Sequence, residues 1–149
     1  ESVAVRNELG EKVLHPRGRN DEAAAEHRRA LEEARALGDR RLEGESLTWL
    51  GIVYRGIGQG KEAWRLYEQA LGISREVGNR PGEGFVLASL ATVCTDQGRF
   101  EESRRFLEQA LVIHRETGNR RSEGIVLGNL GVLDQDLMNH GPIYPCALK

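Results

Sequence analysis

The chain has 149 residues and a formal net charge of -2, so it lacks the basic surface that phosphate contacts need and is not expected to bind nucleic acid. Two cysteines cannot build a disulfide framework at this length, and no signal peptide or apolar run of about 18 residues is visible. We therefore expect a cytoplasmic protein without a membrane partner, whose core is aliphatic because only 5% of residues are aromatic.

The N-terminal part of the chain divides into an irregular segment and a helical half unit. We expect an irregular helix in the N-terminal segment, residues 1–20, where Pro16 interrupts the pattern. Residues 21–37 form the half unit, because Glu22-Ala23 and Ala30-Leu31 reappear 40 residues later as Glu62-Ala63 and Ala70-Leu71. The half unit is thus a first sign of an internal repeat.

Two complete units follow at residues 38–77 and 78–117. They align without a gap, and 17 of the 40 positions are identical. A terminal half unit occupies 118–139, and 140–149 is a tail without a helical pattern. A period held over more than 100 residues indicates a stacked repeat array that forms one domain.

Each complete unit contains two amphipathic helical patterns. In the first, Leu47, Leu50, Gly51 and Tyr54 have the spacing of one helix face, and the second pattern follows a glycine-rich break. Units are separated by a glycine that suits a helix end and by a residue that suits an N-cap. These N-cap candidates are Asp39, Asn79 and Asn119. The unit is therefore predicted to be a helix, a tight turn, a second helix and a short loop.

The spacing of small residues resembles the tetratricopeptide repeat family. Its small packing positions are occupied here by Gly51, Ala63 and Ala70, and then by Ala91, Ser103 and Ala110. The 40-residue period and the Gly-Asn-Arg and Glu-Gln-Ala-Leu motifs are similar to the subclass found in kinesin light chains, spindle-orientation adaptors and bacterial regulators. The resemblance implies an all-α, right-handed α-solenoid of antiparallel helix pairs.

The sequence departs from the family at several positions. Arg75 and Arg115 replace a proline near the end of the second helix, and His27 takes a large-residue position. The terminal half unit is a solitary first helix, for which we expect a polar outer face. Leucine at Gly131 or at Ala70 is expected to overpack a close helix contact and to destabilise the fold by roughly 1–3 kcal/mol.

No pattern in the chain predicts catalysis, a cofactor or a metal. The segment from Gly56 to Lys61 resembles a phosphate loop, but it lacks the flanking Ser or Thr and the preceding strand. The histidines show no metal-ligand spacing, and Cys94 lies at a core position where it acts as a small hydrophobe. The arginine pairs alternate with Glu and are interpreted as a solvated surface. We therefore predict that the protein is not an enzyme.

The resemblance implies a ligand site on the concave face, which the first helices line. Position by position, this face would present Trp49, Ile52, Arg55, Ser89, Thr92, Asp96, Asn129, Val132 and Gln135. Many family members use an Asn at the position of Asn129 to hydrogen-bond a peptide backbone, whereas Trp49 and Ser89 replace it in the other two units. Trp49 is either a binding anchor or a ring packed against the N-terminal segment.

Three functions remain open at this point. The first is a scaffold that binds a protein or peptide. The second is a regulatory or sensory module of a larger signalling protein, either an ATPase or a transcription regulator. The third and weakest is a small-molecule binder or an enzyme, which would require a deep pocket with convergent polar groups.

Overall fold

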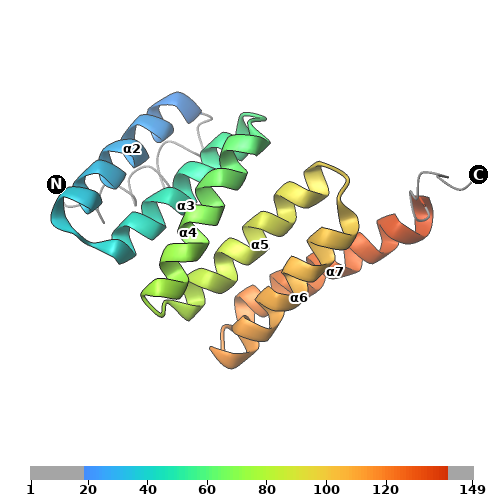
Figure 1. Ribbon diagram of the computed structural model, residues 1–149. Coiled ribbons are helices and arrows are strands. Elements are labelled where there is room, and N and C mark those ends of the chain that lie inside the picture. The colour runs from blue at the N-terminus through green and yellow to red at the C-terminus, as the bar shows by residue number, and fades with distance from the viewer. Residues whose placement is uncertain (1–18, 141–149) are drawn as a thin grey trace, which may run out of the picture.

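The computed structural model describes residues 19–140, which form a row of antiparallel helices (Figure 1). Helices make up 88% of the described residues, which contain no strand, so the predicted all-α solenoid is confirmed. The predictions for residues 1–18 and 141–149 lie outside the described part. The helices are α2 (Asn20–Leu37), α3 (Arg40–Gly56), α4 (Gly60–Glu76), α5 (Arg80–Asp96), α6 (Phe100–Glu116) and α7 (Arg120–His140).

The helix boundaries follow from capping residues that the sequence repeats. The predicted N-caps are confirmed: the side chain of Asn79 accepts a hydrogen bond from the Gly82 amide at 3.1 Å, and Asp39 and Asn119 do the same for their helices. Gly78 ends the preceding helix with a φ of 69°, a left-handed conformation that glycine adopts without strain. The phosphate-loop-like segment is the α3–α4 turn, as the repeat predicts.

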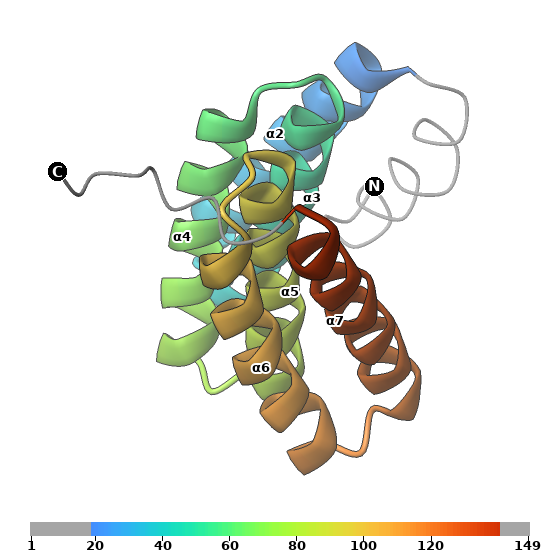
Figure 2. The same ribbon diagram turned by 90° about the vertical axis from the view of Figure 1, so that its right-hand side faces the viewer.

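The first and second helices of the units lie in separate layers. Figure 2 shows the second helices α4 and α6 on one side of the molecule and the first helices α5 and α7 on the other. The predicted small positions make the close contacts. A Cβ atom on Gly51 would lie 2.5 Å from the Tyr67 ring, and Ser103 donates a 2.8 Å hydrogen bond to the Ala91 carbonyl. Leucine at the fully buried Ala70 therefore remains a prediction of overpacking.

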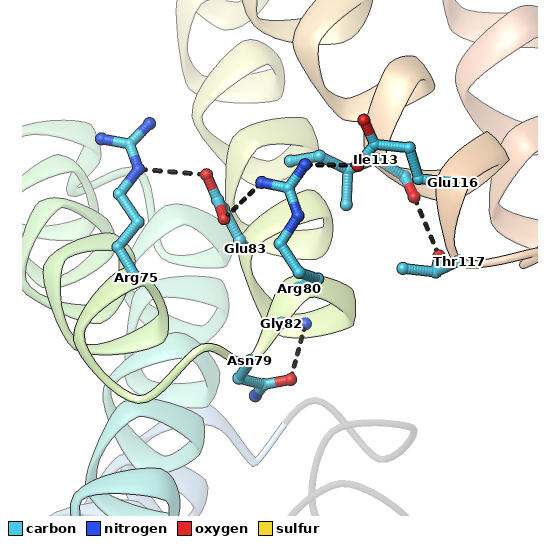
Figure 3. A network of polar contacts seen from close by, with 8 residues as sticks. All are labelled: Arg75, Asn79, Arg80, Gly82, Glu83, Ile113, Glu116 and Thr117. Atoms are coloured by element: carbon cyan, nitrogen blue, oxygen red, sulfur yellow. Dashed lines mark hydrogen bonds and ion pairs between the residues drawn. The ribbon is translucent and has the colours of Figure 1, made fainter.

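A repeated network of charged side chains connects neighbouring units at the loop end (Figure 3). The buried carboxylate of Glu83 accepts hydrogen bonds from Arg75 of the preceding unit and from Arg80, and Arg80 also pairs with Glu116 on the second helix of its own unit. The same arrangement occurs 40 residues earlier around Glu43. The arginine that replaces the family's proline therefore anchors the next helix. Arg40 belongs to one of the arginine pairs that were interpreted as a solvated surface, so that interpretation was incomplete.

Helix α7 differs from the other first helices because no described helix covers one of its faces. Gly131 is exposed, and a Cβ atom there would have no neighbour within 4 Å. The prediction of overpacking at Gly131 is therefore wrong for this structure. The expected polar outer face is also wrong, because the apolar side chains of Leu127 and Met138 are exposed there.

Candidate functional site

The nine predicted site residues all lie on α3, α5 and α7, whose shared surface is called here the first-helix face. They do not form one cluster. They divide into an aromatic contact at Trp49, an ion pair, a polar group that lines two cavities, and two residues that join none of these. Each part is described in turn because its chemistry differs.

Trp49 lies half-buried between two other helices. Its ring stacks on His27 of α2 at 6.1 Å between centroids, and Phe85 of α5 lies 6.4 Å away on the other side. The tryptophan therefore contributes to packing between units and also borders the first-helix face. The predicted packing against the N-terminal segment falls on residues outside the described part, and the contact with α2 leaves part of the ring accessible.

Arg55 and Asp96 form an ion pair across the first-helix face, with 2.7 Å between Nε and Oδ2. This pair borders a cavity of about 720 Å³ at the turn ends, which Lys61 and Glu62 also line. The charges in the cavity are balanced, two basic and two acidic, and Arg55 is already engaged. The cavity therefore offers no concentrated charge for an anion or a metal ion.

Ser89, Thr92, Asn129 and Val132 are brought together between α5 and α7. Two adjacent cavities, of about 190 and 140 Å³, lie here, and both are lined by Thr92 and Asn129. Ser89 and Thr92 donate their hydroxyl protons to the carbonyls of the preceding helical turn, at 3.0 and 2.9 Å. Asn129 is exposed and makes no side-chain hydrogen bond within the described residues, so its amide can both donate and accept.

The remaining predicted residues contribute less. Ile52 is half-buried and packs against the core that α2 to α5 share, so most of its side chain serves the fold. Gln135 is exposed and lines none of the cavities described above. Neither residue is placed with the polar group around Asn129.

Sequence reasoning missed three residues beside this polar group. Phe85 and Ile125, which are 43% and 56% exposed, line the 190 Å³ cavity. They occupy the same repeat position, which would have been the signal. His114 reaches the same cavity from α6, although it is only 2% exposed and its Nδ1 has no hydrogen-bond partner. Burial lowers the pKa of His114, which favours its neutral form.

The described residues contain no cluster of metal-binding side chains, and none of their helices is long and apolar enough to cross a membrane. Cys94 is fully buried, and burial raises the pKa of its thiol to about 11, which suppresses the reactive thiolate. The features of the described residues that stand out are therefore binding surfaces.

Comparison with known proteins gives the same architecture. A family model described as "Tetratricopeptide repeat" matches residues 5–76, and a second model with that description matches residues 86–117. No curated protein sequence matches. The crystal structure of BtubC (BKLC) from P. vanneervenii is 25% identical with a TM-score of 0.75, and covers 94% of this chain and 55% of that one.

Two further solved structures share the fold. A putative kinesin light chain from Podospora anserina with nearly identical repeats is 21% identical, with a TM-score of 0.67 over 77% of this chain and 56% of its own. A STAND signal-transduction ATPase with a repeat sensor, from Pyrococcus horikoshii, is 23% identical, with a TM-score of 0.67 over 72% and 17%. The chain thus spans about half the length of BtubC and of the kinesin light chain structure.

Proposed function

Because the chain belongs to the tetratricopeptide repeat family, we propose that it is a scaffold that binds a protein or peptide on its concave, first-helix face. Repeats of this family are generally protein-interaction scaffolds. A cytoplasmic location remains a prediction.

The observation that carries the proposal is a row of partly exposed apolar side chains along three successive first helices. Trp49, Phe85 and Ile125 lie on α3, α5 and α7, and the last two border the same cavity. Asn129 and Thr92 lie beside the row and supply polar groups. An extended segment across this face could bury apolar side chains while Asn129 bonds its backbone, a combination typical of peptide recognition.

The test begins with the partner captured by the immobilised protein and identified, followed by calorimetry on variants. Asn129→Ala should weaken binding by about 1–2 kcal/mol without affecting stability, because Asn129 is exposed. Trp49→Ala should weaken binding too, but its contacts with α2 and α5 mean that its melting curve must be measured.

The matched control is Arg105→Ala on the second helix α6, since Arg105 is exposed and makes no interaction within the described residues. The neighbouring Arg104 is unsuitable as a control, because it pairs with Asp134 and its replacement would disturb α7. If Arg105→Ala abolishes binding while both first-helix variants bind normally, the partner uses another surface and the proposal fails.

A regulatory module within a larger signalling protein is the second candidate. The likeness to the repeat sensor of a STAND ATPase favours it, and binding of a partner on the first-helix face would serve that role equally well. The length of the native reading frame tests it: an adjoining ATPase or DNA-binding domain would support the module, and a reading frame confined to the repeats would exclude it.

A further inference from the structure

The phenol of Tyr67 fills the junction between α3 and α5. Its ring packs on Gly51, and its hydroxyl lies near Ser89, Arg55 and Asp96. Tyr67 is 1% exposed, and burial raises its pKa to about 12, so the hydroxyl is neutral at physiological pH. A side chain from α4 therefore closes this part of the first-helix face.

The equivalent place in the next unit is the cavity of about 140 Å³. Leu107 replaces Tyr67 in the repeat register, so α6 supplies no aromatic ring here, and the hydroxyl of Ser103, which also lines the cavity, is bonded to the Ala91 carbonyl. The neighbours of the Tyr67 phenol have counterparts 40 residues later, and these line the cavity: Ala91, Thr95, Asn129 and Asp136. The cavity therefore occupies the space where the repeat elsewhere holds a phenol.

The volume of this cavity suits a single aromatic ring. A protein cavity of about 150 Å³ can hold benzene, whereas drug-sized ligands occupy sites of about 300–1,000 Å³. At about 140 Å³ the cavity is too small for a typical metabolite. A ring entering from the first-helix face would pass Val132, which is 60% exposed at the mouth.

The polar lining favours a neutral hydrogen-bond donor. Thr92 and Thr95 already donate their hydroxyl protons to helix carbonyls, at 2.9 and 3.1 Å. The half-buried Asp136 carboxylate forms no hydrogen bond or ion pair within the described residues, and it can only accept. Asn129 beside it can accept as well. A phenol hydroxyl matches these acceptors, while an anionic ring would be repelled by Asp136.

We propose that this cavity binds the side chain of a tyrosine from the partner, in the manner in which Tyr67 occupies the preceding junction. The proposal rests on the proposed function, because the tyrosine belongs to the segment that the first-helix face would bind. It adds the identity of one ligand residue and the residues that select it. Leu107 forms the apolar wall, and Asn129 and Asp136 receive the hydroxyl.

The first experiment uses p-cresol, which is the tyrosine side chain itself, with the whole ¹⁵N-labelled chain. In amide NMR titrations p-cresol should give saturable shifts at Thr95, Asn129 and Leu133. Toluene, which lacks the hydroxyl, should bind about 2- to 12-fold more weakly. Equal or tighter binding of toluene or of 3-methylindole would overturn the choice of a phenol, and no saturable shift with p-cresol would overturn the site.

The second experiment exchanges two residues between the cavity and the equivalent place in the preceding unit. The double variant Ala91→Gly/Leu107→Tyr recreates the Gly51–Tyr67 pair and should fill the cavity from within, so that p-cresol no longer binds. The reciprocal variant Gly51→Ala/Tyr67→Leu should open a second p-cresol site beside Ser89. Unchanged p-cresol binding in the filled variant would contradict the proposal.

Two single variants test the same cavity if the double variant Ala91→Gly/Leu107→Tyr does not fold. Val132→Glu places a charge at the exposed mouth and should weaken all the aromatic probes by about tenfold or more. Asp136→Asn should reduce the preference of the cavity for p-cresol over toluene. Probe binding that is unaffected by either variant would place the ring elsewhere and overturn the proposal.

The outcome separates this inference from the proposed function. If p-cresol fails to bind but Asn129→Ala weakens an identified partner, the scaffold function stands and the tyrosine cavity does not. If p-cresol binds as expected but no first-helix variant changes binding of the partner, the cavity accepts a phenol, and both the proposed use of this face and the assignment to a tyrosine of the partner are wrong.

Discussion

The same packing motif occurs on the first helices α3 and α5 and on the terminal helix α7. Its side chains are buried on α3 and α5 but exposed on α7. Leu47 and Leu87 are each 1% exposed, whereas their counterpart Leu127 is 44% exposed. Gly51 touches the Tyr67 ring, whereas Gly131 has no neighbour. The difference arises because α4 and α6 cover their first helices, while no described helix covers this face of α7. A packing motif therefore stabilises a helix only where a partner surface meets it.

The largest expected difference between these helices concerns the leucine of the motif. Leu87→Ala should lower the free energy of unfolding by about 2–5 kcal/mol, because it opens a cavity in a packed core. Leu127→Ala should cost less than about 1 kcal/mol, since much of that side chain already faces solvent. Denaturant unfolding of both variants measures the difference, and equal losses would show that α7 is covered in solution.

The glycine position gives a matched test of overpacking. Gly51→Leu should destabilise the protein by about 1–3 kcal/mol or more, because even a Cβ atom there would lie 2.5 Å from the Tyr67 ring. Gly131→Leu should be neutral or slightly stabilising, since leucine has the higher helix propensity and meets open space. Thermal melts of the Gly51→Leu and Gly131→Leu variants measure this difference in stability. A large loss at Gly131 would mean that the exposed face has a partner in solution.

The ion-pair network should show a smaller contrast of the same kind. Glu83→Gln should cost about 1–2 kcal/mol, because this buried carboxylate accepts from Arg75 and Arg80. Glu123→Gln in α7 should cost less than about 1 kcal/mol, since Glu123 bonds only Arg115 within the described residues. Urea midpoints at low and high salt test this, and a larger effect at Glu123 would contradict it.

The smallest effect concerns His114, which stands where the earlier units have Ala34 and Ser74. Burial lowers its pKa in the folded state, so below the unfolded value of about 6.5 the unfolded chain binds protons that the folded chain excludes. Stability should therefore fall as the pH decreases from about 7 towards the lowered pKa. His114→Ser should flatten this part of the stability profile, and an unchanged slope would exclude His114 as its source.

The sequence by itself predicted the helices, their order and the repeat period. Asp39 and Asn79 cap their helices as expected, and Gly78 adopts the left-handed conformation that ends one. These features depend on residues within about four positions along the chain, because capping and helical hydrogen bonds are local. The nine site residues could be assigned to the first helices for the same reason, because the repeat pattern determines which helix each residue belongs to.

Only the tertiary structure decided which repeated motifs are buried and which site residues meet. Arg80 reaches Glu116 across 36 residues, Arg55 is held by Asp96, and replacement of Tyr67 by Leu107 leaves a cavity beside Asn129. None of these follows from a single helix. Burial, ion pairing and cavity volume depend on the shape of the partner surface, and so the same motif is core in α5 and exposed surface in α7.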